Sequence, residues 1–225
     1  MSSIISLLVP TRNRPDGLLE MVRSAITMAD DPDNVEVIAI TDLDDNSYDA
    51  VSHPNMTIHS VERTVLSNYW NIAYCYSKGE IFMHAGDDIR FRTSGWDTIV
   101  RRHFDAVPDK ILFLYGRDGI QDEALGTHGF IHQKWVDAVG YFVPPYFSSD
   151  YNDTWLNEVA ESIGRRVYEP EIYTEHMHPS AGKGELDKTH QERLERHERD
   201  NVDGLYQSLA QQRILDSEKL RRVMQ

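Results

Sequence analysis

Glu80-Ile81-Phe82-Met83-His84-Ala85-Gly86-Asp87-Asp88 is the stretch of sequence from which the fold can be predicted. Its apolar run is short and follows Gly79, which is typical of a buried strand and not of a helix. Strands of parallel sheets are buried on both faces, so their sequences are continuously apolar. Ligands of open α/β sheets bind beyond the carboxyl ends of such strands. We therefore expect Asp87 and Asp88 at the edge of a ligand site.

These two neighbouring carboxylates also point to a kind of ligand. Adjacent negative charges repel each other unless a cation or a network of donors offsets them. A hard divalent cation with a phosphate group attached to it is a natural partner for such a pair. The alternative is an ordinary turn after the strand, because Asp is a common turn former.

The rest of the chain alternates between predicted strands and predicted helices. Gly79 is expected to end one of these helices as its C′ residue. The alternation predicts an α/β fold with a mainly parallel central sheet covered by helices on both faces. No GxGxxG or GxxxxGK[ST] motif is present, so neither a dinucleotide site nor a P-loop is supported. The other strands are expected at residues 4–9, 35–41, 56–61, 111–115, 130–131 and 166–168, and the helices at 18–28, 68–78, 96–104, 134–139 and 153–163.

Length and charge limit the classes of function. The 225 residues suit one large domain or a domain with a tail, and the net charge of −14 argues against a nucleic-acid partner. The single cysteine, Cys75, excludes an intramolecular disulfide and a cysteine-cluster zinc site. Residues 4–9 are too short for a signal peptide, and no stretch has the length of a transmembrane helix. We expect a soluble cytoplasmic protein.

The composition changes near residue 180. Residues 181–184 form a polar, glycine-containing hinge, and residues 191–200 are nearly all charged. We expect a domain over residues 1–180 and a charged helical extension over residues 181–225. The extension is expected to pack on the body or on a second subunit of a homo-oligomer, with its charge run as a solvated face.

Polar residues follow the first two predicted strands. Arg12 and Arg14 lie in the loop after the first strand, where they can meet a phosphate or a base, although a loop arginine is usually only solvated. Asp42 follows the second strand, where a carboxylate can accept a hydrogen bond from a base or a ribose hydroxyl. An Asx turn is the alternative, and it suits Asp45 and Asn46 better than Asp42.

Two segments resemble the family 2 glycosyltransferases, which have the GT-A nucleotide-sugar fold. These are residues 6–14, with the sequence SLLVPTRNR, and residues 62–88, which contain Asn71, Gly79-Glu80 and the final Asp87-Asp88. The resemblance covers about residues 4–178 and leaves the extension outside. It implies a single GT-A-like, Rossmann-like domain that binds a nucleotide-diphosphate sugar together with Mn²⁺ or Mg²⁺.

The resemblance also implies roles for the residues at the strand ends. The Asp-X-Asp element of the family falls on Ala85-Gly86-Asp87, and its first aspartate is absent. Asp88 would hold the metal, and Asp87 would meet the ribose or a water on the metal. His176 would reach the same metal, with His178 two residues further on. The nucleotide would lie against Pro10, Thr11, Arg12, Arg14, Asp42, Arg63, Asn71 and Asp87.

The implied reaction is transfer of a sugar to an acceptor hydroxyl with inversion, as in an inverting hexosyltransferase. Asp153, at the start of a predicted helix, would be the catalytic base, with Asp150 as a rival. The alternative for Asp153 is a helix N-cap, a role that Asp commonly fills. Residues Gly126, Thr127 and His128 resemble the loop that faces a carbohydrate or other hydroxyl acceptor, with a tight turn as the alternative.

Two other functions compete with a UDP-sugar transferase. A nucleotide-sugar-binding module without catalysis would explain Ala85 in place of the first aspartate and Asn152 in place of an acid before Asp153. A nucleotidyltransferase would also place acidic residues and a metal on an α/β sheet. It normally needs a glycine-rich basic loop near the first strand, and residues 11–15 contain no glycine.

Overall fold

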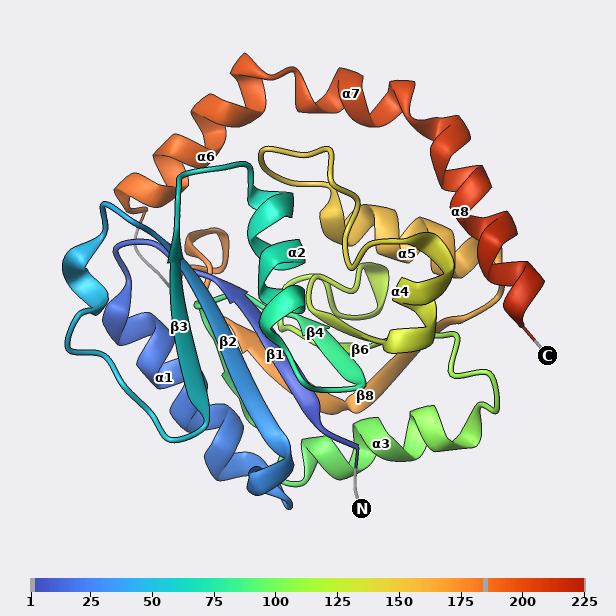
Figure 1. Cartoon of the computed structure of the whole chain (residues 1–225), viewed down its shortest axis with the longest axis horizontal. Coiled ribbons are helices and arrows are strands. Elements are labelled where there is room, and N and C mark those ends of the chain that lie inside the picture. The colour runs from blue at the N-terminus through green and yellow to red at the C-terminus, as the bar shows by residue number, and fades with distance from the viewer. Residues whose placement is uncertain (1–2, 184–185, 225) are drawn as a thin grey trace.

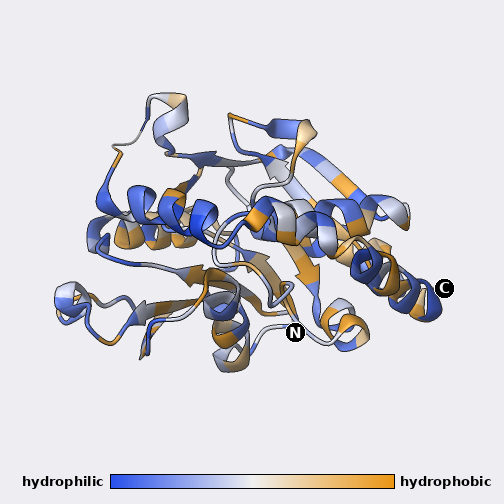
Figure 2. Cartoon of the chain, turned by 90° about the horizontal axis from the view of Figure 1, so that it is seen from above, coloured by the Kyte–Doolittle hydropathy of each residue, from blue (hydrophilic) through white to orange (hydrophobic). Residues whose placement is uncertain are grey.

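Eight strands form a sheet in the order β3-β2-β1-β4-β7-β6-β8-β5 in the computed structural model, which describes residues 3–183 and 186–224. Hydrophobic residues gather on the strands, whereas hydrophilic residues predominate on the outer helices (Figure 2). The strands are β1 (Ile5–Pro10), β2 (Val35–Asp42), β3 (Met56–Val61), β4 (Ile81–His84), β5 (Ile89–Phe91), β6 (Phe113–Arg117), β7 (Gly129–His132) and β8 (Arg166–His176).

The sheet is mixed, so the prediction of a mainly parallel sheet was only partly right. Strands β3, β2, β1 and β4 pair in parallel, and β6 also pairs in parallel with β8. Strand β7 is antiparallel to both β4 and β6, and β5 is antiparallel to β8. The chain returns from β6 to β7 without an α-helical crossover, and a parallel pair needs such a crossover.

Helices cover both faces of the sheet (Figure 1). Successive side chains of β1 point to opposite faces: Ile5 and Leu7 join the cluster with α1 and α3, whereas Leu8 joins the cluster with α2, α4 and α5. These buried faces hold the carboxyl ends of the parallel strands in place. The helices are α1 (Pro15–Met28), α2 (Leu66–Tyr76), α3 (Trp96–Ala106), α4 (Gln133–Val139) and α5 (Asn152–Ser162), with short 3-10 helices at Pro32–Asn34, Asn46–Tyr48, Asp122–Ala124 and Pro179–Ala181.

Strand β8 is much longer than the predicted strand at residues 166–168. It continues through Pro170 to His176, and the short strand β5, which we did not predict, pairs with its end. Proline and charged residues inside a strand are typical of an edge or an irregular pairing, and the register with β6 does shift between Tyr115 and Arg117. The extra length places His176 opposite Ile89, beside Asp88.

Gly79 does not cap the helix before it, contrary to the prediction. Helix α2 ends at Tyr76 with Ser77 as its C-cap in an extended conformation. A Cβ atom on Gly79 would lie 2.7 Å from the carbonyl oxygen of Ile4 and would also clash with Ser6. Glycine is therefore required here because β1 and the start of β4 approach each other closely.

The extension forms three helices that curve around the body (Figure 1). They are α6 (Lys188–Arg199), α7 (Val202–Ser208) and α8 (Ala210–Val223), and α8 packs against α4 and α5. The predicted hinge contains two glycines. Gly182 adopts a positive φ of 69°, and Gly184 lies outside the described residues. Within residues 3–183 and 186–224, none of the helices combines the length and the apolar character that crossing a bilayer requires.

Candidate active site

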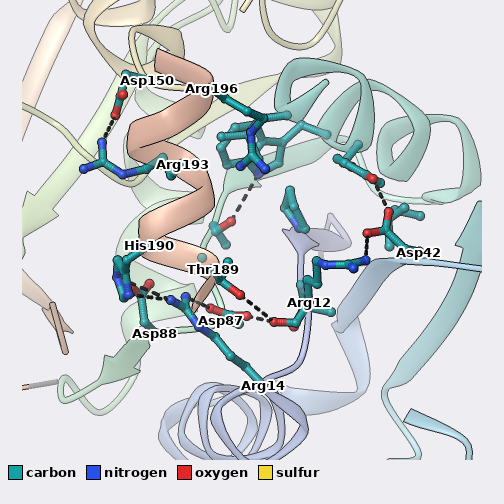
Figure 3. A pocket seen from close by; sticks show the side chains of 18 of the residues that line it. Arg12, Arg14, Asp42, Asp87, Asp88, Asp150, Thr189, His190, Arg193 and Arg196 are labelled. Atoms are coloured by element: carbon teal, nitrogen blue, oxygen red, sulfur yellow. Dashed lines mark hydrogen bonds and ion pairs between the residues drawn. The ribbon is translucent and has the colours of Figure 1, made fainter. Parts of the chain in front are cut away.

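A cavity of about 290 Å³ lies where β1, β2 and β4 end, and helix α6 forms its opposite wall (Figure 3). The carboxyl ends of parallel strands meet at one edge of a sheet, which explains why residues distant in sequence converge here. Among the residues singled out in the sequence, those that line the cavity are Pro10, Thr11, Arg12, Arg14, Asp42, Arg63, Asp87, Asp88, His128, Asp150, His176 and His178.

Asp87 is held in a fixed position by neighbours from the loop after β1. The hydroxyl of Thr11 donates to one of its oxygens at 2.8 Å, and Nη1 of Arg14 lies 3.1 Å from the other. The Tyr48 hydroxyl lies 2.5 Å from that of Thr11 and completes the network. Burial and the neighbouring charge of Asp88 raise the pKa of Asp87 to about 6.

Asp88 forms an ion pair with a histidine that β8 supplies. Nε2 of His176 lies 3.3 Å from a carboxylate oxygen of Asp88, and Nδ1 lies 3.7 Å from Asp118. Burial alone would raise the pKa of Asp88, but the hydrogen bond and charge of His176 hold it well below its usual value. Burial alone would lower the pKa of His176, but the two carboxylates raise it to about 9.

Three of these residues fit a divalent cation. One ligand atom each from Asp88, His128 and His176 can be chosen such that all three atoms lie within 4.8 Å of one another. Nε2 of His128 is buried and has no hydrogen-bond partner among the described residues. Buried polar atoms normally have a partner, and a metal ion would supply one here. Carboxylate and imidazole together suit several divalent metals, including Mn²⁺. This arrangement differs from the prediction, which placed His128 in an acceptor loop and included Asp87 and His178 among the metal ligands.

His178 lies outside this cluster. Its Nδ1 is 2.8 Å from the hydroxyl of Ser180, and its ring packs edge-on against His190. Two of the predicted acceptor residues form hydrogen bonds with residues outside the cavity lining. The amide of Gly126 donates to Asn157 at 3.0 Å, and the hydroxyl of Thr127 donates to Asp118 at 2.7 Å. Neither Gly126 nor Thr127 lines the cavity.

The other end of the cavity is formed by the residues after β2. Asp42 is buried there and accepts hydrogen bonds from Arg12 and from the Tyr69 hydroxyl. The Asx turn is made by Asp45, which accepts from the amide of Ser47 at 3.1 Å. Asp42 therefore faces the cavity, and the turn alternative applies to Asp45.

Asp153 lies next to the main cavity and not inside it. It lines a second, more open hollow between the start of α5 and helix α6, and Asp150 and Arg193 border both spaces. The N-cap of α5 is Tyr151, so Asp153 is not the cap. Its carboxylate accepts from the Thr154 amide at 2.7 Å. Burial, with the nearby charge of Asp150, raises the pKa of Asp153 to about 6.

Asp150, the rival for Asp153, is tied to helix α6. One of its oxygens pairs with Arg193, and the other lies 2.7 Å from Nδ1 of His197. Its φ of 28° lies in the left-handed region, which is strained for an aspartate outside a special context. Both oxygens are engaged, so Asp150 is the poorer proton acceptor of the two carboxylates.

Asn71 does not reach the cavity, contrary to the prediction. Its amide nitrogen donates to the carbonyls of Ser67 and Val143 at 3.0 and 2.9 Å, and its amide oxygen accepts from the Phe142 amide at 2.9 Å. These bonds hold the loop before α5 against α2. We therefore expect Asn71 to have a structural role.

Replacing Asn71 with Ala tests this structural role. We expect the free energy of unfolding to fall by about 2–3 kcal/mol, because several partly buried backbone groups lose their partner. Chemical denaturation followed by circular dichroism measures the loss. Nucleotide affinity, measured well below the melting temperature, should stay unchanged, and a variant of normal stability with weaker nucleotide binding would restore the predicted role.

Helix α6 contributes residues that the sequence did not reveal. His190, Arg193 and Arg196 all line the cavity, although the charge run at residues 191–200, which contains the two arginines, was expected to be a solvated face. The available signal was their spacing of three residues, which places them on one side of a helix. Charged residues surround them in the sequence, so this face could not be distinguished from the outer one.

Solved structures share this fold. The chain matches a mannosyltransferase from Pyrobaculum calidifontis, solved with GDP-Man and Mn²⁺, with a TM-score of 0.65 and 17% identity over 81% of this chain and 59% of that one. It also matches S. aureus TarS residues 1–349, with a TM-score of 0.57 and 15% identity over 86% of this chain and 71% of that one.

The TarS structure with UDP-GlcNAc gives a TM-score of 0.58 at 14% identity, over 76% of this chain and 58% of that one. No protein-family model and no curated relative matches the chain. This chain spans about three fifths of the mannosyltransferase's length. At these identities the likeness concerns the fold alone: the chain has the mixed α/β fold seen in these glycosyltransferases.

Proposed function

We propose that this protein is an inverting glycosyltransferase of the family 2 type that uses a nucleotide-diphosphate sugar. The observation that carries the proposal is the arrangement at the sheet edge: a cavity with a possible metal cluster at Asp88 borders the hollow that contains Asp153. The donor would occupy the cavity and the acceptor the hollow, and the two spaces share Asp150 and Arg193 as lining residues. The fold shared with solved glycosyltransferases supports the same reaction class.

The nucleotide would occupy the part of the cavity formed by the ends of β1 and β2. Asp42 can accept a hydrogen bond from the base, and Pro10, Thr11 and Arg12 form the adjacent wall. Arg63 borders the same end. Asp87, held by Thr11 and Arg14, would meet the ribose hydroxyls or a water on the metal. The donor's diphosphate would then reach Asp88.

The residues Asp88, His128 and His176 would hold the divalent cation, for which we propose Mn²⁺ or Mg²⁺. Such a cation supplies Lewis-acid stabilisation of the negative charge on the departing nucleoside diphosphate. Asp118, 3.7 Å from His176, orients that imidazole from behind. His178 and Arg14 also line the cavity.

Asp153 would act as the catalytic base. Its carboxylate accepts the proton of the acceptor hydroxyl as the hydroxyl oxygen attacks the anomeric carbon. The bond to the diphosphate breaks on the opposite face of the sugar, so the anomeric configuration inverts. The pKa of about 6 leaves Asp153 ionised at neutral pH. It also makes Asp153 a stronger base than an ordinary aspartate, with a pKa nearer to the operating pH. A carbohydrate or another hydroxyl compound is the proposed acceptor.

Turnover of nucleotide sugars tests the proposal. The protein is incubated with a panel of UDP- and GDP-sugars, candidate acceptors and Mn²⁺, and release of nucleoside diphosphate is followed. Release that depends on an acceptor supports the proposal, with a UDP-sugar as the expected donor. Binding without turnover would instead identify a nucleotide-sugar-binding module, and pyrophosphate released from a nucleoside triphosphate would identify a nucleotidyltransferase.

The pH dependence of turnover follows from the raised pKa of Asp153. Below about pH 6 the carboxyl group is protonated and cannot accept a proton, so kcat should fall about tenfold for each further pH unit. Initial rates at saturating donor and acceptor between pH 4.5 and 8 measure this limb. The limb should vanish in the residual activity of Asp153→Asn, and a wild-type profile that stays flat below pH 6 would contradict the assignment.

A further inference from the structure

Helix α6 is fastened across the mouth of the cavity. At its amino end Asp187 pairs with Arg14, with Nε of the arginine 2.6 Å from a carboxylate oxygen. Two residues further, the hydroxyl of Thr189 donates to the carbonyl of Arg12 at 3.3 Å, and about one turn beyond it Arg193 pairs with Asp150. The helix thus contacts elements on opposite sides of the cavity (Figure 3). The face between these contacts is turned toward the space where a ligand would lie.

The arginines that line the cavity differ in one respect. Arg12, Arg14, Arg63 and Arg193 each form an ion pair with a carboxylate, respectively with Asp42, Asp87, Glu192 and Asp150. Within residues 3–183 and 186–224, the side chain of Arg196 forms neither an ion pair nor a hydrogen bond. Its charge therefore remains available to a ligand.

Arg196 is also partly withdrawn from water. Its Nε is buried without a partner, and burial, together with the nearby positive charge of Arg63, lowers its pKa. Taking an unpaired cation out of water is unfavourable, and the cost is recovered when an anion binds beside it. The guanidinium points into the cavity in Figure 3, so the anion would be part of the ligand.

We propose that Arg196, which lies near Arg63, binds oxygens of the donor's α-phosphoryl group, between the base at Asp42 and the metal cluster at Asp88, so that the extension supplies a wall of the donor site. This inference rests on the proposed function. Asp87 and Asp88 already place two carboxylates beside the metal cluster, and Arg14 is shared between Asp87 and Asp187. The leaving nucleoside diphosphate gains one negative charge as its bond to the sugar breaks. Among the described residues, Arg196 is the arginine in the cavity lining that forms no ion pair with a carboxylate.

A charged acceptor is the other possible source of such an anion, and nucleotide binding separates the two. UDP and GDP are titrated calorimetrically, with Mn²⁺, into the full-length chain and its variants. Arg196→Met keeps the length of the side chain and removes its charge, whereas Arg196→Lys keeps the charge. Arg199→Gln is the matched control, because Arg199 lies on the same helix, is exposed and pairs with Asp200.

We expect Arg196→Met to weaken binding of the preferred nucleoside diphosphate by about 10–100-fold, the range for a charged hydrogen bond. Arg196→Lys should lose clearly less, and Arg199→Gln should match the wild type. Affinity unchanged in Arg196→Met would overturn the inference and favour an anionic acceptor. Equal losses in the Met and Lys variants would overturn it too, because they would indicate packing and not charge.

The same titrations separate this inference from the proposed function. A wild-type chain that binds neither UDP nor GDP with Mn²⁺ contradicts the proposed function itself, and the role of Arg196 falls with it. If the wild type binds one of them and Arg196→Met binds it with the same affinity, only the role of Arg196 is contradicted. Thermal melting of each variant without nucleotide identifies a loss of affinity that reflects unfolding.

Discussion

Replacement of Asp153 by Asn should lower kcat by about 10²–10⁴-fold, the contribution that a general base typically makes. Asn has nearly the same shape and can still accept the hydrogen bond from the Thr154 amide, so the start of α5 should keep its structure. It cannot take the proton of the acceptor hydroxyl. The main cavity does not include Asp153, so the nucleotide Kd should stay within about twofold of the wild-type value.

The measurement combines steady-state release of nucleoside diphosphate with calorimetric titration of the nucleotide. Glu161→Gln is the matched control, because Glu161 is an exposed acid on the same helix. Loss of the Glu161 carboxylate should leave kcat and the nucleotide Kd unchanged. Normal turnover in Asp153→Asn would remove Asp153 from the mechanism. Loss of activity in Asp150→Asn alone would instead assign the base to Asp150.

Replacement of Asp88 by Ala should weaken Mn²⁺-dependent nucleotide binding by at least about 100-fold. Even residues that only support metal ligands typically contribute 10–100-fold to metal affinity, and Asp88 is a candidate ligand itself. Its removal also leaves His176 with only Asp118 as an anionic partner, which changes the orientation of the imidazole. Titration of UDP or GDP with and without Mn²⁺ measures the metal-dependent part of the affinity.

Two comparisons make this result specific. Asp105→Ala removes an exposed carboxylate far along α3 and should not change nucleotide binding. His128→Ala should resemble Asp88→Ala, whereas His178→Ala should retain the response to Mn²⁺, because only His128 belongs to the possible metal cluster. An Asp88→Ala variant with an intact Mn²⁺ response would show that the metal binds elsewhere.

The sequence predicted well where local pattern and chemistry coincide. The apolar runs that end in Pro10, Asp42 and Asp87-Asp88 did form adjacent parallel strands, and their polar ends did converge on one cavity. Such runs must be buried on both faces, and parallel strands align their carboxyl ends. The resemblance of residues 6–14 and 62–88 to family 2 glycosyltransferases led to the same edge of the sheet.

The structure places some predicted site residues differently from the expectation, because the surroundings of a side chain depend on distant neighbours. Asn71 was assigned to the nucleotide from its place in a motif, but it bonds to the backbone of residues 142–143. His128 was assigned to an acceptor loop, but the antiparallel β6–β7 connection carries it to Asp88 and His176. Nothing local to either residue specifies these partners, because they lie tens of residues away in the chain.

The sequence by itself determined the α/β class, the cavity edge with Asp42, Asp87 and Asp88, and the acidic start of α5. Burial patterns and strand ends are local properties, and local properties can be read from neighbouring residues. Only the tertiary structure decided that β7 and β5 run antiparallel to their neighbours and that α6 faces the cavity. A charged helix has the same sequence whether its arginines face water or a ligand, and the difference arises only from what the fold places opposite it.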